Sequence, residues 1–361
     1  MIDMEKDIAL SVIDTERRYS IPEYSESVYS TNAIVSYGKE NDTPILLRNC
    51  FRHSATLKSV IEGYIPYILG EDIIVNEKIA KFAKTVNDRG MTMRQLIASI
   101  SLDYMIYGGF AIQIILSKMG TIKSLYPLDF GRCRTNESGT KIWYSNKNWT
   151  KWGTKGTEFE RYDPDKKQPT SIFYFKGDFT SSVYPLPPYA GAIYDVLTEI
   201  ECAKYSLNTV ARGFSAKYLI QFPENAEVTD EQKKGIEDAI KTKFCGSENE
   251  TNFMLYWRND DGEKIEVSKI ESDETPERYI AIKDNARTNI FVAMRCTPLL
   301  MGLVNGISTG FATSEYRDSF KLFQKSVIEP QQDVIIESLD KIIGCGDGIH
   351  IVPFVINFDE E

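Results

Sequence analysis

The sequence predicts an α+β protein that combines long helices, one β-rich section and one small mixed module. Apolar residues repeat at helical spacing over residues 187–213, and a second long helix begins at Thr275 and Pro276, an N-cap residue followed by a proline at the first helical position. Between residues 110 and 185, short β-branched and aromatic runs alternate with Gly, Asn, Asp and Pro. That alternation indicates antiparallel strands.

Composition limits the classes of protein to consider. The chain has 361 residues, of which 42% are hydrophobic, enough for a core in one large or several small domains. Its formal charge of −10 argues against tight binding of nucleic acid, which works through Lys and Arg. The early residues are too charged for a signal peptide and no apolar run is long enough to span a bilayer, so we expect a protein made and kept in a cytoplasm, with no membrane partner.

The first third of the chain predicts an arm followed by helices. Residues 1–44 are polar and rich in Ser, Tyr and Glu, and we expect an arm without its own core, which either reaches onto a neighbour or is disordered. Helical spacing over residues 44–69 predicts a helix with a break near Pro66 and a stop at Gly70. Further helices are expected at residues 77–86 and 92–106.

The β-rich section begins with the run FAIQIIL and is expected to be a small sheet. Four aromatic residues crowd one part of it: Trp143, Tyr144, Trp149 and Trp152. Aromatic residues on a small sheet are more often its core than a sugar-binding platform, and we favour the core.

The next helix has the cleanest apolar pattern in the chain. After Pro187 and Pro188, apolar residues repeat at steps of four and three from Tyr189 to Phe214. A seam this narrow is expected to pack against another helix, in the same chain or in the next subunit. Strand, helix and two strands then follow up to residue 270, with a turn at Asn259, Asp260, Asp261 and Gly262 that reads as a hairpin signal rather than a metal site.

The C-terminal part predicts two helices separated by a neutral loop. Pro298 and Gly302 are expected to stop the helix that starts at Pro276, and the loop 303–314 contains glycines, hydroxyl side chains and no charge. A long helix follows from Glu315 to about Ile343, which Pro330 must kink or break.

Residues suited to catalysis are scarce. There is no GxxxxGK[ST] phosphate-binding loop, and both histidines, His53 and His350, read as surface or packing residues. The six cysteines form no CxxC pair and read as reduced, mostly buried thiols. We therefore expect no catalytic residue, no metal site and no cofactor. A nuclease or transferase that uses scattered carboxylates remains the rival interpretation from the enzyme class.

The order of these segments resembles the portal proteins of tailed bacteriophages, rings at one capsid vertex through which DNA is packaged and ejected. Four runs carry the resemblance: QLIASISLDYMIYGGFAIQII, YPLPPYAGAIYDVLTEIECAKYSLNTVARGF, CTPLLMG and SEYRDSFKLFQKSVIEPQQDVIIESL. The resemblance implies a portal-like fold, with an α/β wing, a two-helix stem, a small α/β clip, a tunnel loop and a long kinked helix.

The resemblance also divides the chain. It implies an N-terminal arm at 1–44, a wing at 45–186, a first stem helix at 187–213, a clip at 214–272, a second stem helix at 273–302, a tunnel loop at 303–314, a long kinked helix at 315–344 and a C-terminal strand at 345–361. Because few residues follow the long helix, we expect an extended crown domain to be missing or supplied by another protein.

The function implied by the resemblance is that of a ring of about twelve subunits in the virion, at the capsid vertex, that binds double-stranded DNA transiently and without sequence preference. The implied partners are the terminase large subunit, a head–tail connector or adaptor protein and the major capsid protein. The alternative is an adaptor or minor capsid protein that binds DNA or a partner without forming the main ring.

The resemblance assigns roles to three groups of residues. The loop is expected to face DNA, or else to be a plain connector, and the clip turn at 259–262 is expected to face the terminase. Lys283 and Arg287 share a helix face and are expected either to form basic rings in the channel or to pair with Asp195 and Glu199 of a neighbouring stem, the interpretation we favour slightly. The loop residues expected to face DNA are Asn305, Gly306, Ile307, Ser308, Thr309, Gly310 and Phe311.

Overall fold

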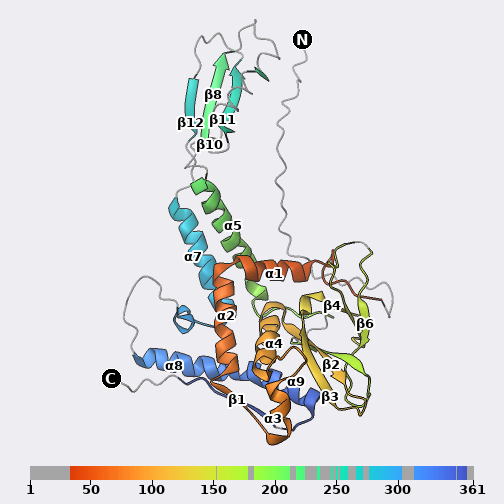
Figure 1. Ribbon diagram of the computed structural model, residues 1–361. Helices are drawn as coiled ribbons and strands as arrows, with labels where there is room; N and C mark the ends of the chain where they lie inside the picture. Colours follow the sequence, from red (N-terminus) through yellow and green to blue (C-terminus); the bar gives the residue numbers. More distant parts are fainter. Residues whose placement is uncertain are drawn as a thin grey trace.

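The computed structural model describes residues 33–151, 153–177, 183–211, 217–223, 234–235, 245–246, 249–250, 253–258, 266–270, 276–302, 313–346 and 348–355. Helices and strands from both ends of the chain form a body, from which two helices, α5 and α7, project side by side toward a small sheet (Figure 1). Among the described helices, none has the length and apolar character needed to cross a membrane.

Four helices open the body: α1 Thr43–His53, α2 Ala55–Leu69, α3 Glu77–Lys84 and α4 Met93–Tyr107. The expected break near Pro66 is wrong, because Pro66 lies inside the last turn of α2. The chain breaks instead at Ser54, whose backbone is extended and whose side chain accepts a hydrogen bond from the Leu57 amide at 3.0 Å as the N-cap of α2. The predicted stop at Gly70 is confirmed.

The predicted antiparallel strands follow, but they form two sheets instead of one. The first has the order β3-β2-β7, from β2 Gly109–Leu116, β3 Ile122–Leu128 and β7 Thr170–Lys176. The second has the order β4-β5-β6, from β4 Cys133–Thr135, β5 Lys141–Tyr144 and β6 Thr157–Glu160. Two of the crowded aromatic side chains are tied into this region.

Trp143 is buried, and the indole of Trp149 donates a hydrogen bond to the Arg132 carbonyl at 2.9 Å. These contacts agree with a packing role for both tryptophans. Trp152 lies outside the described residues.

The helical pair consists of α5 Ile193–Ala211, entered through a short 3₁₀ turn at Ala190–Ala192, and α7 Pro276–Ala293. Beyond the pair, β8 Lys217–Pro223 pairs in parallel with β11 Phe253–Arg258 and antiparallel with β12 Glu266–Ile270, while β9 Cys245–Gly246 pairs with β10 Asn249–Glu250. The second helix of the pair, predicted at residues 273–302, is shorter in the structure. Helix α7 ends at Ala293, and Pro298–Met301 forms a separate 3₁₀ turn, η3.

The long C-terminal helix is interrupted rather than simply kinked. It consists of α8 Thr313–Phe323, a π-helical turn at Gln324–Ile328 and α9 Glu329–Ile343. The amide of Glu329 bonds the Gln324 carbonyl, five residues back, and Pro330, which has no N–H, follows directly. The predicted disruption is confirmed, although it begins before the proline.

A short strand closes the body. β13 Ile349–Val352 pairs antiparallel with β1 Asp72–Val75, so that the last described strand joins the first in one two-stranded sheet.

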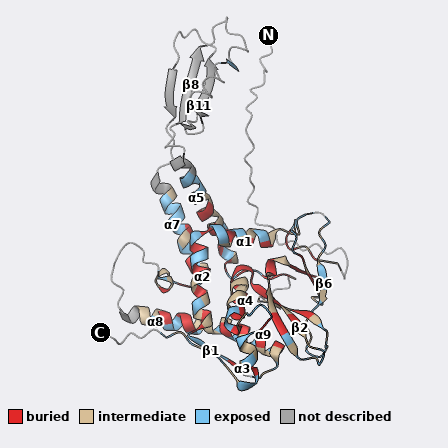
Figure 2. Ribbon diagram, in the orientation of Figure 1, coloured by how far each residue is buried: buried red, intermediate tan, exposed pale blue. Residues whose placement is uncertain are grey.

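The expected arm is shorter than residues 1–44. Val35 and Tyr37 are buried in the core of the body. The ring of Tyr37 stacks on Tyr184 with centroids 4.2 Å apart, and its hydroxyl donates to the Pro185 carbonyl at 2.7 Å. Residues 33–42 therefore belong to the body, and the rest of the predicted arm lies outside the described residues. Figure 2 shows the buried residues gathered in the body and more exposed residues along the helical pair.

Candidate functional site: the helical pair and its attachments

The helical pair is held in a fixed antiparallel register. Near the body, Asn289 Nδ2 donates to Asp195 Oδ1 at 2.8 Å. Farther out, the rings of Tyr205 and Tyr279 stack with centroids 4.4 Å apart. The spacing from Asp195 to Tyr205 on α5 equals the spacing from Tyr279 to Asn289 on α7. Each residue of α5 therefore has a residue of α7 at the same height along the pair. The contacts lie about 15 Å apart along the pair.

A buried carboxylate attaches α5 to the body. Glu199 accepts hydrogen bonds from the Ser54 hydroxyl and from Thr56, whose hydroxyl lies 2.6 Å from Oε1 and whose amide lies 3.3 Å from it. Ser54 and Thr56 stand at the N-terminus of α2, where the helix dipole favours a negative charge. Because Glu199 is only 3% exposed, it fixes one end of α5 against α2.

A second attachment holds the end of α7. The hydroxyl of Tyr64 donates to the Met294 carbonyl, and that of Tyr67 donates to the Leu300 carbonyl at 2.7 Å. Both tyrosines belong to α2, and Phe323 of α8 contacts both rings edge-on. Helix α2 therefore receives α5 at its beginning and the end of α7 near its own end.

The structure fixes the ends of the predicted tunnel loop. Before the loop, η3 ends with Gly302 in the left-handed conformation. After it, α8 begins at Thr313, and Phe320 and Phe323 bring that helix onto Tyr67. The residues expected to face DNA, Asn305 to Phe311, lie outside the described residues, as does the expected terminase-facing turn at 259–262.

The expected ion pairs between neighbouring stems need a correction. Lys283 is exposed on α7, and Arg287 is half-buried with its guanidinium 3.6 Å from Asp284 of its own helix. Of the two proposed acceptors, Asp195 accepts a hydrogen bond from Asn289 on one oxygen and its pairing with a neighbour stays a prediction, whereas Glu199 is buried at the start of α2. Glu199 is therefore unavailable to a neighbour. The sequence offered one signal for its role, the Ser-Ala-Thr run at 54–56, typical of a helix start.

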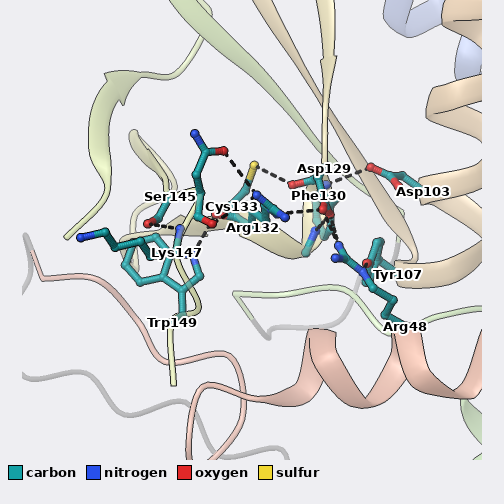
Figure 3. A network of polar contacts seen from close by, with 12 residues as sticks. Arg48, Asp103, Tyr107, Asp129, Phe130, Arg132, Cys133, Ser145, Lys147 and Trp149 are labelled. Atoms are coloured by element: carbon teal, nitrogen blue, oxygen red, sulfur yellow. Dashed lines mark hydrogen bonds and ion pairs between the residues drawn. The ribbon is translucent and has the colours of Figure 1, made fainter. Parts of the chain in front are cut away.

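A polar network ties α1 and α4 to the sheets of the body (Figure 3). Arg48 of α1 pairs with Asp129 and donates to the Tyr107 hydroxyl at 2.9 Å. Asp103 of α4 accepts from the Phe130 amide at 2.9 Å. The pKa of Asp103 is raised to about 8, mainly by burial with a smaller contribution from Asp129, while the Phe130 N–H and Arg48 oppose the rise.

Two buried thiols are poorly suited to nucleophilic chemistry. Burial raises the pKa of Cys50 to about 11 and that of Cys296 to about 12, so both remain protonated thiols at neutral pH. Within the described ranges, no cluster of three or more His, Cys, Asp or Glu side chains could hold a metal ion. The buried polar groups described above instead connect helices to one another and to the sheets of the body.

Comparison with known proteins yields one family and several solved structures. The family model described as phage portal protein matches residues 69–353. A chain in the virion of a native gene transfer agent particle is similar with a TM-score of 0.60 at 15% identity, covering 90% of this chain and 86% of that one.

Two further structures have the same fold. The neck of a native gene transfer agent particle computed with C12 symmetry contains a chain with a TM-score of 0.57 at 16% identity, covering 89% of this chain and 85% of that one. An HK97 family phage portal protein from Corynebacterium diphtheriae gives a TM-score of 0.54 at 10% identity, covering 85% and 93%.

Proposed function

This chain belongs to the phage portal protein family, and we propose that it assembles into a ring-shaped channel at a capsid vertex, through which a viral genome is packaged and ejected. The observation that carries the proposal is the family match over residues 69–353, which includes the body from the end of α2 onward, both helices of the pair and the small sheet beyond them. The chain acts as a conduit without catalysis of its own.

The geometry of the helical pair supports this proposal. Glu199 at the start of α2 and the tyrosine contacts near its end hold α5 and α7 as one rigid projection from the body. Rigid projections of this kind suit a wedge that repeats around a closed cyclic assembly. The similar chain in the gene transfer agent neck comes from a particle region computed with C12 symmetry, and we propose about twelve copies here.

We assign the parts of the chain as follows. The helical pair is the stem, residues 214–272 at its outer end are the clip, and residues 45–186 are the wing. The clip meets the terminase large subunit during packaging and a head–tail connector or adaptor afterwards, while the body meets the major capsid protein. The loop between η3 and α8 faces the channel.

Charge suits a channel that lets DNA move. Each chain carries a formal charge of −10, so twelve copies carry roughly −120 and repel duplex DNA on average. An uncharged loop forms no ion pairs with phosphates, so it contacts the duplex without holding it in place. Lys283 and Arg287 add positive charge on α7 without reversing this balance.

Electron microscopy of the purified full-length protein tests the proposed function. We expect rings with cyclic symmetry and an open central hole. A monomer, or a disc without a hole at concentrations that assemble other portal proteins, would exclude the ring-shaped channel and favour an adaptor or minor capsid protein. Incubation with Mg²⁺ and duplex DNA should yield no cleavage products, and metal-dependent turnover would instead favour the enzyme interpretation.

A further inference from the structure

Exposed apolar side chains concentrate on the helical pair. Among the described residues, half of the large hydrophobic side chains that are exposed belong to α5 or α7. Tyr194 of α5 is 57% exposed and Ile280 of α7 is 60% exposed. Apolar surface gathered in this way on two helices marks an interaction surface more often than chance exposure. The full set is Tyr194, Tyr205, Leu207, Ile280, Ile282 and Val292.

A groove of about 380 Å³ runs along α5 within this surface. Its walls are mainly apolar and aromatic, and its charged member is Glu201, whose side chain is 41% exposed. An intramolecular ion pair to Lys204 at 2.6 Å leaves that carboxylate at the solvent-exposed rim. The lining residues are Tyr194, Leu197, Thr198, Glu201, Cys202, Tyr205 and Tyr279.

The register of the pair places a complementary charge at the same level. Asn289 lies level with Asp195 and Tyr279 lies level with Tyr205, so Lys283 lies level with Glu201. Ile280 lies one step from Tyr279, near the outer end of the groove. A rotation about an axis parallel to the pair moves each residue around the ring but keeps it at its own level. A second copy related in this way therefore brings an exposed lysine and an exposed isoleucine to the height of the groove.

We propose that the groove on α5 receives α7 of the adjacent copy of this chain, with Ile280 against the tyrosine walls and Lys283 facing Glu201. This inference rests on the proposed ring and identifies the contact that closes it. The contact is heterologous, since the α5 groove of one copy meets the α7 ridge of the next, which is the requirement for a ring. It also replaces the expected pairing through Glu199, which the structure buries within its own chain.

Charge reversal in two separate variants tests the proposal. Glu201→Lys alone should place two lysines at every contact, and Lys283→Glu alone should place two glutamates there, so each purified variant should lose rings. Mixed in equal amounts, the two variants should regain rings with alternating copies, because every contact then joins opposite charges. Mass photometry and electron microscopy read the ring fraction in each sample.

Mixing separates a contact between copies from one within a chain, because it cannot repair an intramolecular pair. Rings in each single variant, or no recovery on mixing, would overturn the Glu201–Lys283 contact. Circular dichroism on every sample confirms that the variants are folded. If the unaltered protein forms no rings, the proposed function fails instead, so the two failures are distinguishable.

A second variant tests the apolar part of the contact. Ile280→Asp should weaken assembly by about a hundredfold or more, because a carboxylate without a partner would be buried in an apolar groove. Met119→Asp is the matched control, because Met119 is 85% exposed and lies in a turn of the body. Equal ring formation by the two variants would overturn the proposed contact between the α5 groove of one copy and α7 of the next.

Discussion

Arg134 shows how single residues bind distant parts of this chain together. Its buried guanidinium donates to the side chain of Asn41, to the Asn41 carbonyl at 3.0 Å and to the carbonyls of Gly131 and Cys133 at 2.9 and 2.7 Å. The rings of Tyr37 and Trp149 lie near the same charge. Burial lowers the pKa of Arg134, but an arginine stays charged at neutral pH.

These residue-level roles could not be predicted from the sequence. Asn41 and Arg134 are 93 positions apart, and Ser54 and Glu199 are 145 apart. A local pattern can mark a helix start such as residues 54–56, but it does not mark the distant partner, because the fold alone brings the two residues together. A buried arginine or glutamate looks, in sequence, like any solvated charge.

Arg134→Met should lower the free energy of unfolding by about 3 kcal/mol, since several buried carbonyls would lose their donor. Limited proteolysis should also become faster near residues 33–42, which Arg134 holds through Asn41. Arg132→Met is the control, because that half-exposed side chain pairs with Asp129 at the surface and should cost less than about 1 kcal/mol. Similar losses in urea unfolding of the two variants would contradict the role given to Arg134.

The raised pKa of Asp103 predicts that the folded protein loses stability as pH rises. Its pKa is about 8 in the folded protein and 3.8 as the ordinary value, so between these values the folded chain keeps a proton that the unfolded chain releases. The contribution of Asp103 to stability is therefore fully present below the ordinary pKa and is lost as pH rises through the folded pKa of about 8. A one-unit shift corresponds to about 1.4 kcal/mol, and partial solvent screening reduces the expected loss to about 2 kcal/mol between about pH 5 and pH 8.

Asp103→Asn should flatten this pH dependence, because an amide oxygen still accepts from the Phe130 amide and cannot ionise. Urea unfolding at both ends of the pH interval measures the difference. Asp163→Asn is the control. In the unaltered protein, hydrogen bonds from the Asp165 amide and Lys166 hold the pKa of Asp163 below its ordinary value, so its loss should leave the dependence of stability on pH in this interval unchanged. An unaltered slope in Asp103→Asn would show that another group causes the pH dependence.

At the scale of elements, local signals predicted most helices and strands. Thr92 and Gln95 form the capping box that starts α4, and Gly70 and Gly108 follow the ends of α2 and α4. The break lies at Ser54 and not near Pro66, where the sequence predicts it. A proline in the last helical turn removes few backbone hydrogen bonds, whereas a serine N-cap starts a new helix. The shorter α7 and the π-helical turn depend on packing against α2, which local patterns do not record.

Gly108→Ala should be among the most damaging single-methyl changes in the body. Gly108 has a φ of 81°, and a Cβ there would lie 2.1 Å from the Leu186 carbonyl oxygen, which is backbone and cannot move aside. Gly90→Ala is the control, since φ is 76° there and a Cβ would meet no atom within 4 Å. The control should cost about 1–2 kcal/mol from strain alone, and Gly108→Ala clearly more. Equal melting temperatures would refute the close approach.

At the scale of the whole molecule, the order of segments carried the most reliable inference. The sequence identified the family through helices, loop and module in a fixed order, and the family match confirms it. The faces that meet between copies could not be predicted, because periodicity shows that a helix has an apolar seam but not which chain covers it. The described part of α5 shows the answer within one chain, with Glu199 turned to α2 and Tyr205 to α7.

Deleting residues 305–310 should leave ring assembly intact and impair DNA filling. The two attachments of α7 and α8 to α2 lie outside the deleted segment, so the body and the helical pair should fold as before. Ring formation by electron microscopy and DNA content of capsids assembled in cells are the two measurements. Normal filling would mean that the loop only connects η3 to α8.

The π-helical turn at Gln324–Ile328 accommodates one surplus residue in an otherwise continuous helix. Each residue of an α-helix advances the chain by about 100° around the axis. Because the wide turn takes up this residue, removing a single residue from it would let α8 and α9 merge into one regular helix with little rotation of α8, whereas winding every residue as regular α-helix would rotate α8 by roughly that angle. The π-helical turn therefore preserves the phase of α8 relative to α9 despite one extra amino acid in the helix.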